Sequence, residues 1–381
     1  MDVIVVGGGL IGSAAAKYIA EAGHRVTVFV SPEPETYDEL STLGRPLASH
    51  YDEGRITRIT DRRPYWADVA RRSIERYRTI EQRSGIGFYI QRPLVYMGPR
   101  PDELVTVGQA HGAAVSTIAA EDITQTYGLR RPAGYNLGAA AHELAPAGFI
   151  NPRRMVRAQL TMALAAGATL VPWPAVLLSG GSRAKPVTVT GADGTIAIAQ
   201  RVLLTTGAYG ATLAGVRLPL ERRLRTVALL ELARPGPELP VLIMSELNRP
   251  GMSGIYWVPP IHYPDGRIYL KIGGDPPLAP SVFEHDGVDV ASVIAQWFQQ
   301  GGSEEEVAEL VAVATEILPD RGVRLVDHKP CVVTYTPDDR PIMDWIDDRI
   351  ALAVGGCGSA GKSADAIGED AARLVVSPDR K

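Results

Sequence analysis

The sequence predicts an α/β protein that is organised around a nucleotide-binding unit at its N-terminus. Residues 2–6 form a short apolar, β-branched run that is typical of a buried strand. A glycine-rich turn follows, residues 13–23 have the alanine-rich composition of a helix, and residues 25–30 form a second apolar run. Another strand, glycine turn and helix occupy residues 350–375, and β-rich sequence separates the two units.

The first glycine turn has the spacing G-x-G-x-x-G of the dinucleotide-binding fingerprint. In this pattern Gly7 makes the tight turn, Gly9 lets the backbone approach a pyrophosphate, and Gly12 lets the helix pack closely on the strand. The start of the helix adds free N–H groups and a partial positive charge, which favour phosphate. The sequence therefore predicts that a dinucleotide binds at Gly7, Gly9, Leu10, Ile11 and Gly12.

One part of the fingerprint is missing. An acidic residue usually ends the second strand and binds the ribose hydroxyls, but that position is Val30. Ser31 follows directly, and Glu33 and Glu35 lie slightly further along. Ser31 or Glu33 is the expected substitute, with water and backbone as the alternative. Because no basic residue lies nearby to hold a 2′-phosphate, NADP is not favoured.

Length and composition narrow the class of protein. With 381 residues the chain is long enough for two domains. A net charge of −4 gives no reason to expect nucleic acid or a membrane surface as a partner, and no apolar run approaches the length of a membrane span. Cys331 and Cys357 imply no disulfide framework, and no metal site is expected. We expect a cytoplasmic protein, because a strand at residue 2 leaves no room for a signal peptide.

Helices and strands alternate between the two glycine units. Helices are predicted at residues 64–84, 102–110, 120–127, 152–166, 288–298 and 304–317. Asn151 is placed to cap the helix that starts at Pro152. A polar loop is expected at residues 35–49. Strands are predicted at residues 88–90, 94–97, 169–178, 186–190, 195–199, 201–206, 226–232 and 240–246, and as a hairpin at 253–259 and 267–273.

Two basic features have an ordinary interpretation when only the pattern is considered. Arg55 and Arg58 lie three residues apart, and at helical spacing they would form one solvated basic face. Lys271 lies in an apolar strand, where desolvation disfavours its charge. Simple alternation along residues 267–271 favours an outward-facing lysine.

The C-terminal unit contains a second glycine turn with a familiar spacing. Gly356, Gly361, Lys362 and Ser363 fit the G-x-x-x-x-G-K-S pattern of a P-loop. We reject this interpretation because too little α/β structure follows the turn. The N-terminal fingerprint also already accounts for the nucleotide.

The two glycine units at opposite ends of the chain resemble the FAD-dependent D-amino-acid oxidase superfamily, and within it the monomeric sarcosine oxidase and N-methyltryptophan oxidase group. The resemblance covers essentially the whole chain. It implies an α/β (α+β) fold in which a Rossmann-like FAD-binding domain carries an inserted antiparallel-sheet substrate domain. The expected FAD-binding domain comprises residues 1–85, 147–220 and 322–381, and the expected substrate domain comprises residues 86–146 and 221–321.

The resemblance assigns roles at the arginine segment and at the cysteine. The family's D-T-R-I-x-R segment corresponds to residues 53–58. This match implies that Arg55 lies by the flavin ring and that Arg58 binds the substrate carboxylate. The family's flavin-linking cysteine corresponds to Cys331, which implies an 8α-thioether to FAD.

Two lysines also match family motifs. The lysine that closes the family's G-L-K-L strand corresponds to Lys271, where a cation near flavin N5 assists the reaction with O2. The family's G-F-S-G-H-G-F-K turn corresponds to residues 355–362, so Lys362 would pair with the substrate carboxylate. The resemblance extends the expected cofactor site to Val176, Gly207, Gly356, Gly358, Ser359 and Lys362.

Departures from the family pattern concern the substrate. Ser359 stands where the family has a histidine, and Val333 stands where it has an aromatic residue, while Tyr256 remains in its Ile-Tyr-Trp-Val-Pro segment. Compared with the family pattern, the substrate pocket lacks one aromatic side chain, at Val333, and one side chain that could act as a base, at Ser359. Sarcosine itself is therefore not expected as the substrate. Lys271, Arg55, Tyr256 and Ser359 form the expected catalytic set.

The sequence therefore predicts a monomeric FAD-dependent oxidase of a secondary, N-methyl or cyclic amine or amino acid. It would oxidise a C–N bond to an imine, with hydride transfer to flavin and reduction of O2 to H2O2. The first alternative is a flavin-dependent dehydrogenase of a hydroxy acid or alcohol that uses another electron acceptor. A second is a flavin-binding protein without catalytic activity.

Overall fold

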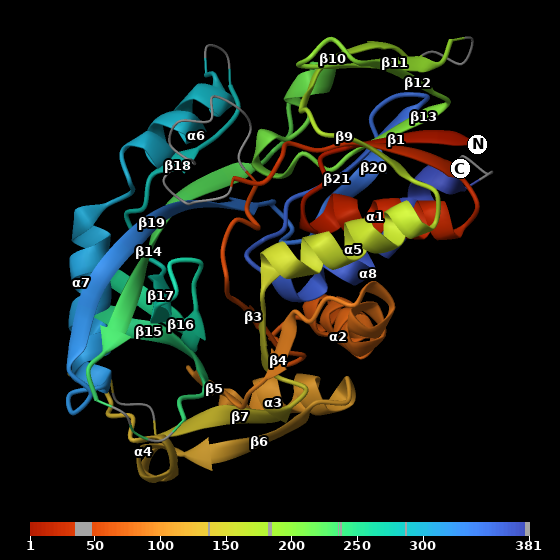
Figure 1. Cartoon of the computed structure of the whole chain (residues 1–381). Coiled ribbons are helices and arrows are strands. Elements are labelled where there is room, and N and C mark those ends of the chain that lie inside the picture. The colour runs from red at the N-terminus through yellow and green to blue at the C-terminus, as the bar shows by residue number, and fades with distance from the viewer. Residues whose placement is uncertain are drawn as a thin grey trace.

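The computed structural model of the chain describes residues 1–34, 48–135, 138–181, 185–234, 236, 238–285 and 288–377. Most of the loop expected at residues 35–49 lies outside these ranges. Within them, the strands form one sheet of six strands, one of nine strands and two of three strands. Figure 1 shows both chain termini beside the six-stranded sheet, with the nine-stranded sheet in the other part of the molecule. The predicted α/β (α+β) fold class is confirmed.

The N-terminal unit forms the centre of the six-stranded sheet. β1 (Asp2–Val6) lies between β2 (Arg25–Phe29) and β13 (Arg201–Leu204), and all three strands are parallel. The full order is β20-β21-β13-β1-β2-β9, with β9 (Thr169–Val171) and β21 (Ile350–Val354) parallel to their neighbours and β20 (Ile342–Trp345) antiparallel at the edge. Both glycine units therefore belong to one sheet, although their strands lie almost 350 residues apart in sequence.

Helices from distant parts of the chain pack together on one face of this sheet (Figure 1). α1 (Leu10–Glu21) packs against both α5 (Pro152–Ala165) and α8 (Ala360–Val376), and α2 (Pro64–Ser84) packs against α8. The predicted cap of α5 is confirmed, because the Asn151 side chain accepts a hydrogen bond of 2.9 Å from the backbone N–H of Arg154. α1 begins three residues earlier than predicted, so the end of the fingerprint forms its first turn.

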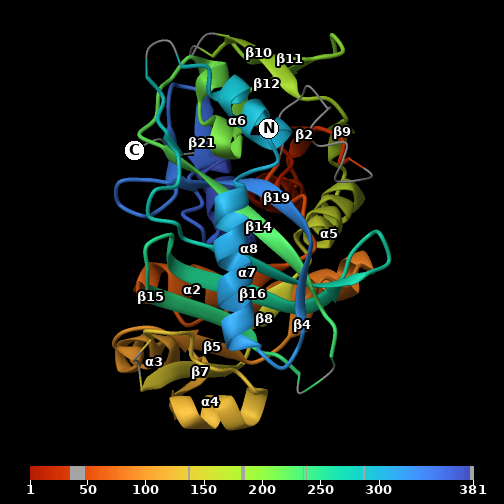
Figure 2. The same ribbon diagram turned by 90° about the vertical axis from the view of Figure 1, so that its left-hand side faces the viewer.

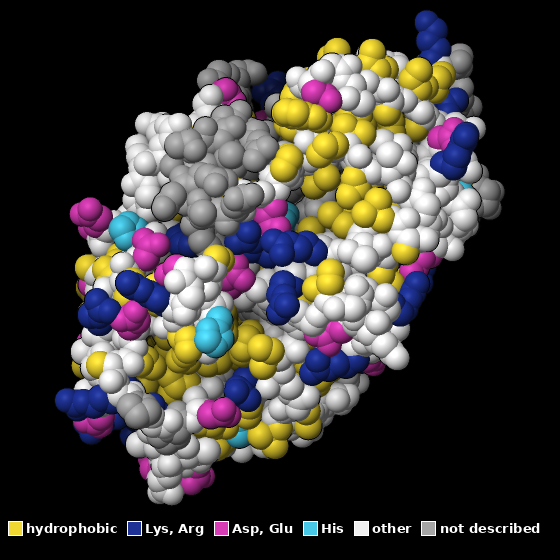
Figure 3. Space-filling model, viewed as in Figure 1, with side chains coloured by type: hydrophobic (Ala, Val, Ile, Leu, Met, Phe, Trp, Pro, Cys, Tyr) yellow, Lys and Arg dark blue, Asp and Glu magenta, His cyan; other side chains and the backbone are white. Residues whose placement is uncertain are grey.

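The predicted strand at residues 169–178 is wrong, because two strands in different sheets replace it. Pro172 and Pro174 interrupt the run, and proline has no N–H to donate to a strand ladder. β9 ends before them, and β10 (Ala175–Gly180) starts a separate antiparallel sheet with β11 (Val187–Gly191) and β12 (Ile196–Ala199). Figure 3 shows hydrophobic side chains over this small sheet. Leu177, Ile196 and Ile198, which belong to its strands, are exposed.

The nine-stranded sheet has the order β18-β14-β17-β16-β15-β5-β7-β6, with β19 paired along the free side of β14. The predicted hairpin is confirmed as β16 and β17, which pair antiparallel. In Figure 2 α7 (Glu304–Ile317) runs across this sheet, and Leu310 of α7 packs in one core with Trp257 and Ile272. The strands are β5 (Leu94–Met97), β6 (Ala114–Ala119), β7 (Ala139–Ala145), β14 (Glu221–Leu232), β15 (Val241–Arg249), β16 (Met252–His262), β17 (Ile268–Gly274), β18 (Ser281–Val282) and β19 (Val323–Tyr335).

The remaining helices are short and lie around the nine-stranded sheet. They are α3 (Pro101–Ala110), α4 (Ala120–Tyr127) and α6 (Val290–Gln299). A second small sheet has the order β3-β8-β4, with β3 (Arg55–Thr57), β8 (Gly148–Ile150) and β4 (Tyr89–Gln91). The helical spacing assumed for Arg55 and Arg58 is therefore wrong, because Arg55 begins a strand that pairs with β8. The division into two domains at the expected boundaries stays a prediction.

A single buried carboxylate joins the helices that cover the six-stranded sheet. The side chain of Asp365 on α8 is fully buried and accepts hydrogen bonds from Lys17 Nζ at 2.6 Å and from Tyr18 Oη and Gln159 Nε2 at 2.9 Å. Arg76 on α2 adds an ion pair of 2.7 Å. Burial acts to raise the pKa of Asp365, but the charges of Lys17 and Arg76 outweigh it and lower that pKa.

We expect Asp365→Ala to lower the free energy of unfolding by about 3–5 kcal/mol, because it leaves the buried Lys17 without its carboxylate. Urea unfolding of the purified protein, followed by circular dichroism, measures this difference. Asp370→Ala is the matched control on the same helix, since its ion pair with Arg72 is partly exposed and such pairs contribute about 0–1 kcal/mol. Equal effects of the two substitutions would contradict the structural role of Asp365.

Candidate cofactor and substrate site

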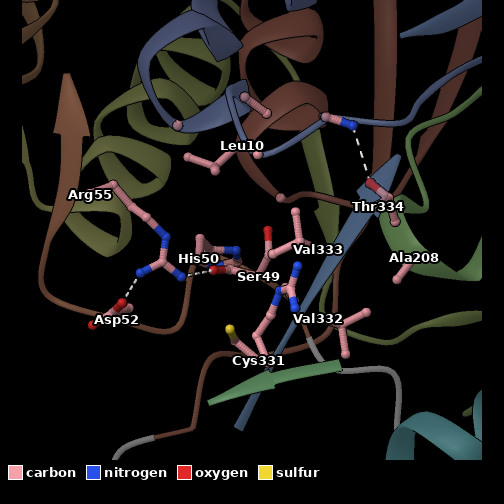
Figure 4. A pocket seen from close by; sticks show the side chains of 18 of the residues that line it. Leu10, Ser49, His50, Asp52, Arg55, Ala208, Cys331, Val332, Val333 and Thr334 are labelled. Atoms are coloured by element: carbon pink, nitrogen blue, oxygen red, sulfur yellow. Dashed lines mark hydrogen bonds and ion pairs between the residues drawn. The ribbon is translucent and has the colours of Figure 1, made fainter. Parts of the chain in front are cut away.

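One large cavity lies between the six-stranded and nine-stranded sheets. Its volume is about 1120 Å³, and the residues that line it come from both glycine units and from β14, β16 and β19. Ligand pockets in proteins typically measure about 300–1,000 Å³, so this cavity is large enough for a dinucleotide together with a small substrate. Figure 4 shows part of its wall, where Leu10 and Arg55 lie across from Cys331 and its neighbours.

The first glycine turn forms one end of the cavity. Gly7 has a φ of +101°, which favours glycine, and Thr205 Oγ1 donates a hydrogen bond of 2.6 Å to its carbonyl oxygen. A Cβ at Gly12 would overlap the carbonyl oxygen of Gly7, so this glycine lets the helix approach the turn. A Cβ at Gly9 would meet only His50 Nδ1 within 4 Å. The backbone at Gly9 is therefore open to a ligand, and Leu10 and Ile11 line the cavity beside it.

The ribose position is occupied by an apolar residue. A Cβ at Gly8 would lie 2.6 Å from Val30 Cγ2, so the valine packs directly on the glycine turn. Ser31 lines the cavity. Glu33 forms ion pairs with Arg153 and Arg157, the latter at 2.9 Å, and these arginines occupy both carboxylate oxygens. Of the two expected substitutes, only Ser31 therefore faces the cavity, while Glu35 lies outside the described residues.

His50 lines the same end of the cavity, and sequence reasoning missed it. Its ring is buried, and its Nδ1 atom has no hydrogen-bond partner within the described part of the chain. Burial lowers the pKa of His50 to about 4. A buried polar atom without a partner, beside an open glycine turn, fits a bound polar group. No periodic pattern marks a single histidine in a loop, so the sequence gives no signal for it.

The second glycine unit reaches the cavity next to β19. Gly356, Gly358, Ser359 and Lys362 line the cavity at the start of α8, and Val176 and Gly207 line it on the side of the six-stranded sheet. The backbone N–H of Gly356 donates a hydrogen bond of 3.2 Å to Thr334 Oγ1, which ties this turn to β19 (Figure 4). The segments around residues 9 and 358, which come from opposite ends of the chain, therefore both form part of the wall of this cavity.

Cys331 lies on β19 among the cavity-lining residues. In the strand ladder it is paired with Arg225 of β14, which also lines the cavity. Burial raises the pKa of the Cys331 thiol, whereas the charges of Arg55 and Lys271 act to lower it. Cys357, by contrast, is buried in a cluster with Trp66 and Val69.

Asp52 organises the charges beneath the arginine segment. Its carboxylate forms ion pairs with Arg55 and Lys271 and accepts a hydrogen bond of 3.2 Å from Tyr263 Oη. Arg55 lines the cavity and also donates to the carbonyl oxygen of Ser49 at 2.9 Å (Figure 4). Asp52 is a further functional residue that sequence reasoning did not identify.

Lys271 is fully buried, so the expected outward-facing lysine is wrong. Its Nζ donates to Asp52 and, at 2.9 Å, to the carbonyl oxygen of Gly54. Burial and the nearby charge of Arg55 lower the pKa of Lys271. Among the described residues, those that line the cavity include Arg55 and Tyr256 but not Lys271, whose Nζ lies 6.0 Å from the centre of the Tyr256 ring.

Arg58 and Lys362 meet at a second buried acid, Asp61. Arg58 Nη1 lies 3.0 Å and Lys362 Nζ 2.7 Å from Asp61 Oδ2, and both basic side chains line the cavity. Burial and the charge of Arg58 lower the pKa of Lys362 to about 8, although the charge of Asp61 acts in the opposite direction. The two residues expected to bind one substrate carboxylate are thus adjacent in space. Sequence reasoning missed Asp61 as well.

These features fit FAD. The open backbone at Gly9 and the start of α1 suit a pyrophosphate, and the arginine segment, Cys331 and the second glycine turn surround the far part of the cavity. Among the described residues no group of three or more His, Cys, Asp or Glu side chains is arranged to hold a metal ion. Every helix of the described chain is too short or too polar to cross a membrane.

Comparisons with known proteins agree with this site. The family model described as DAO, FAD dependent oxidoreductase, matches residues 2–374. The chain is 25% identical to a probable sarcosine oxidase of Arabidopsis thaliana, over 98% of this chain and 88% of that protein.

Solved structures share the fold over the whole chain. The Tyr258Phe mutant of NikD, an unusual amino acid oxidase essential for nikkomycin biosynthesis, has a TM-score of 0.77 at 22% identity and is covered over 94% of its length. L-Proline dehydrogenase from P. horikoshii has a TM-score of 0.74 at 18% identity, with 94% covered. Glycine oxidase from Geobacillus kaustophilus has a TM-score of 0.70 at 19% identity, with 95% covered. The expected superfamily is confirmed, and the chain belongs to the DAO family of FAD-dependent oxidoreductases.

Proposed function

We propose that the enzyme oxidises the C–N bond of a carboxylate-bearing amine or amino acid to an imine and passes the electrons to O2. The observation that carries this proposal is the pair formed by Arg58 and Lys362, two largely buried cations beside the second glycine turn. A planar guanidinium and an ammonium group together suit a carboxylate. The relatives named sarcosine oxidase and glycine oxidase also act on amino acids, as their names state.

The reaction balances as a transfer of two electrons and two protons. The amine loses two electrons and two protons and becomes an imine. O2 gains the two electrons and two protons and becomes H2O2. Bound FAD supplies the two-electron acceptor between these half-reactions. The protein orients the substrate. Arg58 and Lys362 hold its carboxylate, and Tyr256 and Val333 form part of the cavity wall. Asp52 is paired with two cations, which makes its carboxylate a weak base. Asp52 therefore does not take a proton from the substrate amine, and the amine binds in its deprotonated form.

The substrate class follows from the small side chains near the second glycine turn. Ser359 and Val333 both line the cavity and replace the larger histidine and aromatic residue of the sarcosine oxidase group. The extra space suits a secondary, N-methyl or cyclic amine bulkier than sarcosine. A monomeric, cytoplasmic enzyme remains the expectation from the sequence.

One observation favours a second candidate, a flavin dehydrogenase that uses an acceptor other than O2. Lys271, the expected oxygen-activating cation, is paired with Asp52 and lies behind Arg55. This pairing reduces the positive field that would favour superoxide formation. If the substrate of this dehydrogenase is a hydroxy acid, its carboxylate would bind at the same pair of cations, whereas a simple alcohol would not use them.

A screen of N-methyl, cyclic and ordinary amino acids tests the proposal. We expect at least one to bleach the flavin absorbance under anaerobic conditions and to release one H2O2 per substrate in air. Arg58→Ala should raise the KM of that substrate at least tenfold, because a hydrogen bond to a charged group contributes about 1.5–3 kcal/mol. Arg71→Ala, which removes an exposed arginine from α2, is the control. Bleaching without peroxide would identify the dehydrogenase, and an unchanged KM would exclude Arg58 from the site.

Covalent attachment of FAD through Cys331 is tested by acid precipitation of the purified protein. We expect the yellow colour to stay with the pellet, because a thioether survives denaturation. Cys331→Ala should release the flavin into the supernatant, and Cys357→Ala should not, since Cys357 is buried in the Trp66 cluster. Free flavin from the unaltered protein would rule out the linkage.

Lys271→Met tests the proposed role of this lysine in the reaction with O2. We expect reoxidation of the reduced enzyme by O2 to slow by about 10²-fold, since preorganised charge at a reacting centre contributes on this scale. Anaerobic reduction by substrate should keep its rate. Stopped-flow absorbance separates the two half-reactions, and Lys329→Met, which also removes a lysine near the cavity, is the comparison. Unchanged reoxidation would reject the assignment.

A further inference from the structure

We propose that Asp61 is the positioning residue of the substrate-carboxylate site, where it holds Arg58 and Lys362 side by side and keeps the Lys362 ammonium charged for one carboxylate. This inference rests on the proposed function. Asp61 lies where β3 leads into α2, and Lys362 lies in the first turn of α8, so one acid joins two elements that are about 300 residues apart in sequence.

The backbone that carries Asp61 is held from the nine-stranded sheet. Glu143 on β7 is fully buried, and its two carboxylate oxygens accept the backbone N–H groups of Ile59 at 3.0 Å and Thr60 at 2.8 Å. Arg58 also donates to the carbonyl oxygen of Thr60. Asp61 Oδ1 accepts the backbone N–H of Arg63 at 3.2 Å, which leaves Oδ2 for the two cations. The carboxylate is therefore fixed before any ligand arrives.

Donors remain for a ligand after Asp61 is satisfied. A guanidinium has five N–H donors and an ammonium has three. Within the described chain, the hydrogen bonds of the Arg58 side chain to protein use Nη1 alone, and Lys362 Nζ donates to Asp61 alone. Both side chains line the cavity, whereas Asp61 is behind them. A substrate carboxylate thus meets two oriented cations whose combined charge Asp61 reduces from two to one.

The charges around Lys362 explain why Asp61 is needed. Arg58 faces it from the β3 end, Arg55 packs on the adjacent Gly361, and Glu143 lies beyond the Asp61 segment. The hydroxyl of Tyr77 on α2 donates to the Lys362 backbone carbonyl at 2.9 Å, and Asp365 on α8 is engaged with its own cations. Burial and Arg58 both favour the neutral amine, and the pKa of Lys362 is about 8 even with Asp61 in place. Without the Asp61 charge this pKa falls further.

The test is the pH dependence of benzoate binding to the FAD-loaded enzyme, measured by titration calorimetry between pH 5.5 and 9.5. Benzoate is an unreactive monocarboxylate whose charge is constant in this range. Because neutral Lys362 no longer attracts the carboxylate while Arg58 stays charged, the affinity should fall as the pH rises through the pKa of Lys362, with a midpoint near 8. In Asp61→Asn we expect the midpoint to move down by at least about one unit, which lowers the protonated fraction of Lys362 about tenfold at pH 8.5.

Three further variants separate the possible outcomes. Lys362→Arg should remove the pH dependence in this range, because a guanidinium stays charged. Asp68→Asn, an exposed acid that is paired with Arg71, should leave the midpoint unchanged. Asp61→Ser, which also removes the charge, should repeat the shift of Asp61→Asn; the FAD absorbance and thermal midpoint establish that either variant is folded.

An unchanged midpoint in the folded Asp61 variants, with Lys362→Arg insensitive to pH, would overturn the role of Asp61 and leave the proposed function intact. Benzoate binding that is unaffected by Arg58→Ala would instead contradict the carboxylate site, and with it the proposed function.

Discussion

The structure depends on the buried carboxylate of Asp365. It accepts hydrogen bonds from α1 and α5 and is paired with Arg76 of α2, while it lies on α8, one turn after Lys362. An unpaired charge in a protein interior is costly, so this cluster is stable only when all its members are in place. α1 starts at the first glycine turn and α8 at the second. The same carboxylate therefore fixes the first glycine turn relative to the second.

Two more carboxylates, which lie at the site, also pair with cations from separate parts of the chain. Asp52 and Asp61 lie within ten residues of each other, and each is paired with one arginine of the segment between them and with one distant lysine. Asp52 joins Arg55 to Lys271 of β17, and Asp61 joins Arg58 to Lys362 of α8. The arginine segment therefore joins the two regions, because a lysine from each large sheet region is paired with a carboxylate beside it, and Lys362 also lines the cavity. Without these acids, four neighbouring cations would repel one another in a site with little water.

The sequence predicted those features whose signals are local. The βαβ unit, the Asn151 cap and the β16–β17 hairpin depend on neighbouring residues, and the structure confirms them. For Lys271 the alternation pattern alone favoured the wrong face, because alternation identifies an outward face only when one side of a sheet is solvated, and β17 is buried along almost its whole length. Asp61 gave no signal, since its meaning depends on Lys362, 301 residues away. A loop acid is ordinary in sequence, and only the fold shows which cations it serves.

The arrangement of these pairs separates substrate binding from electron acceptance. Arg58 and Lys362 line the cavity in front of their acid, so their remaining donors face the ligand. Lys271 is placed differently: among the described residues Asp52 lines the cavity and Lys271 does not, so the charge of Lys271 lies behind a neutralising partner. Asp61 lies behind Lys362 and therefore orients its ammonium group. Asp52 lies between Lys271 and the cavity and therefore screens the charge of that lysine. The carboxylate site is therefore built for direct contact. Under the proposed function, the reaction with O2 would depend instead on how completely Asp52 offsets the charge of Lys271.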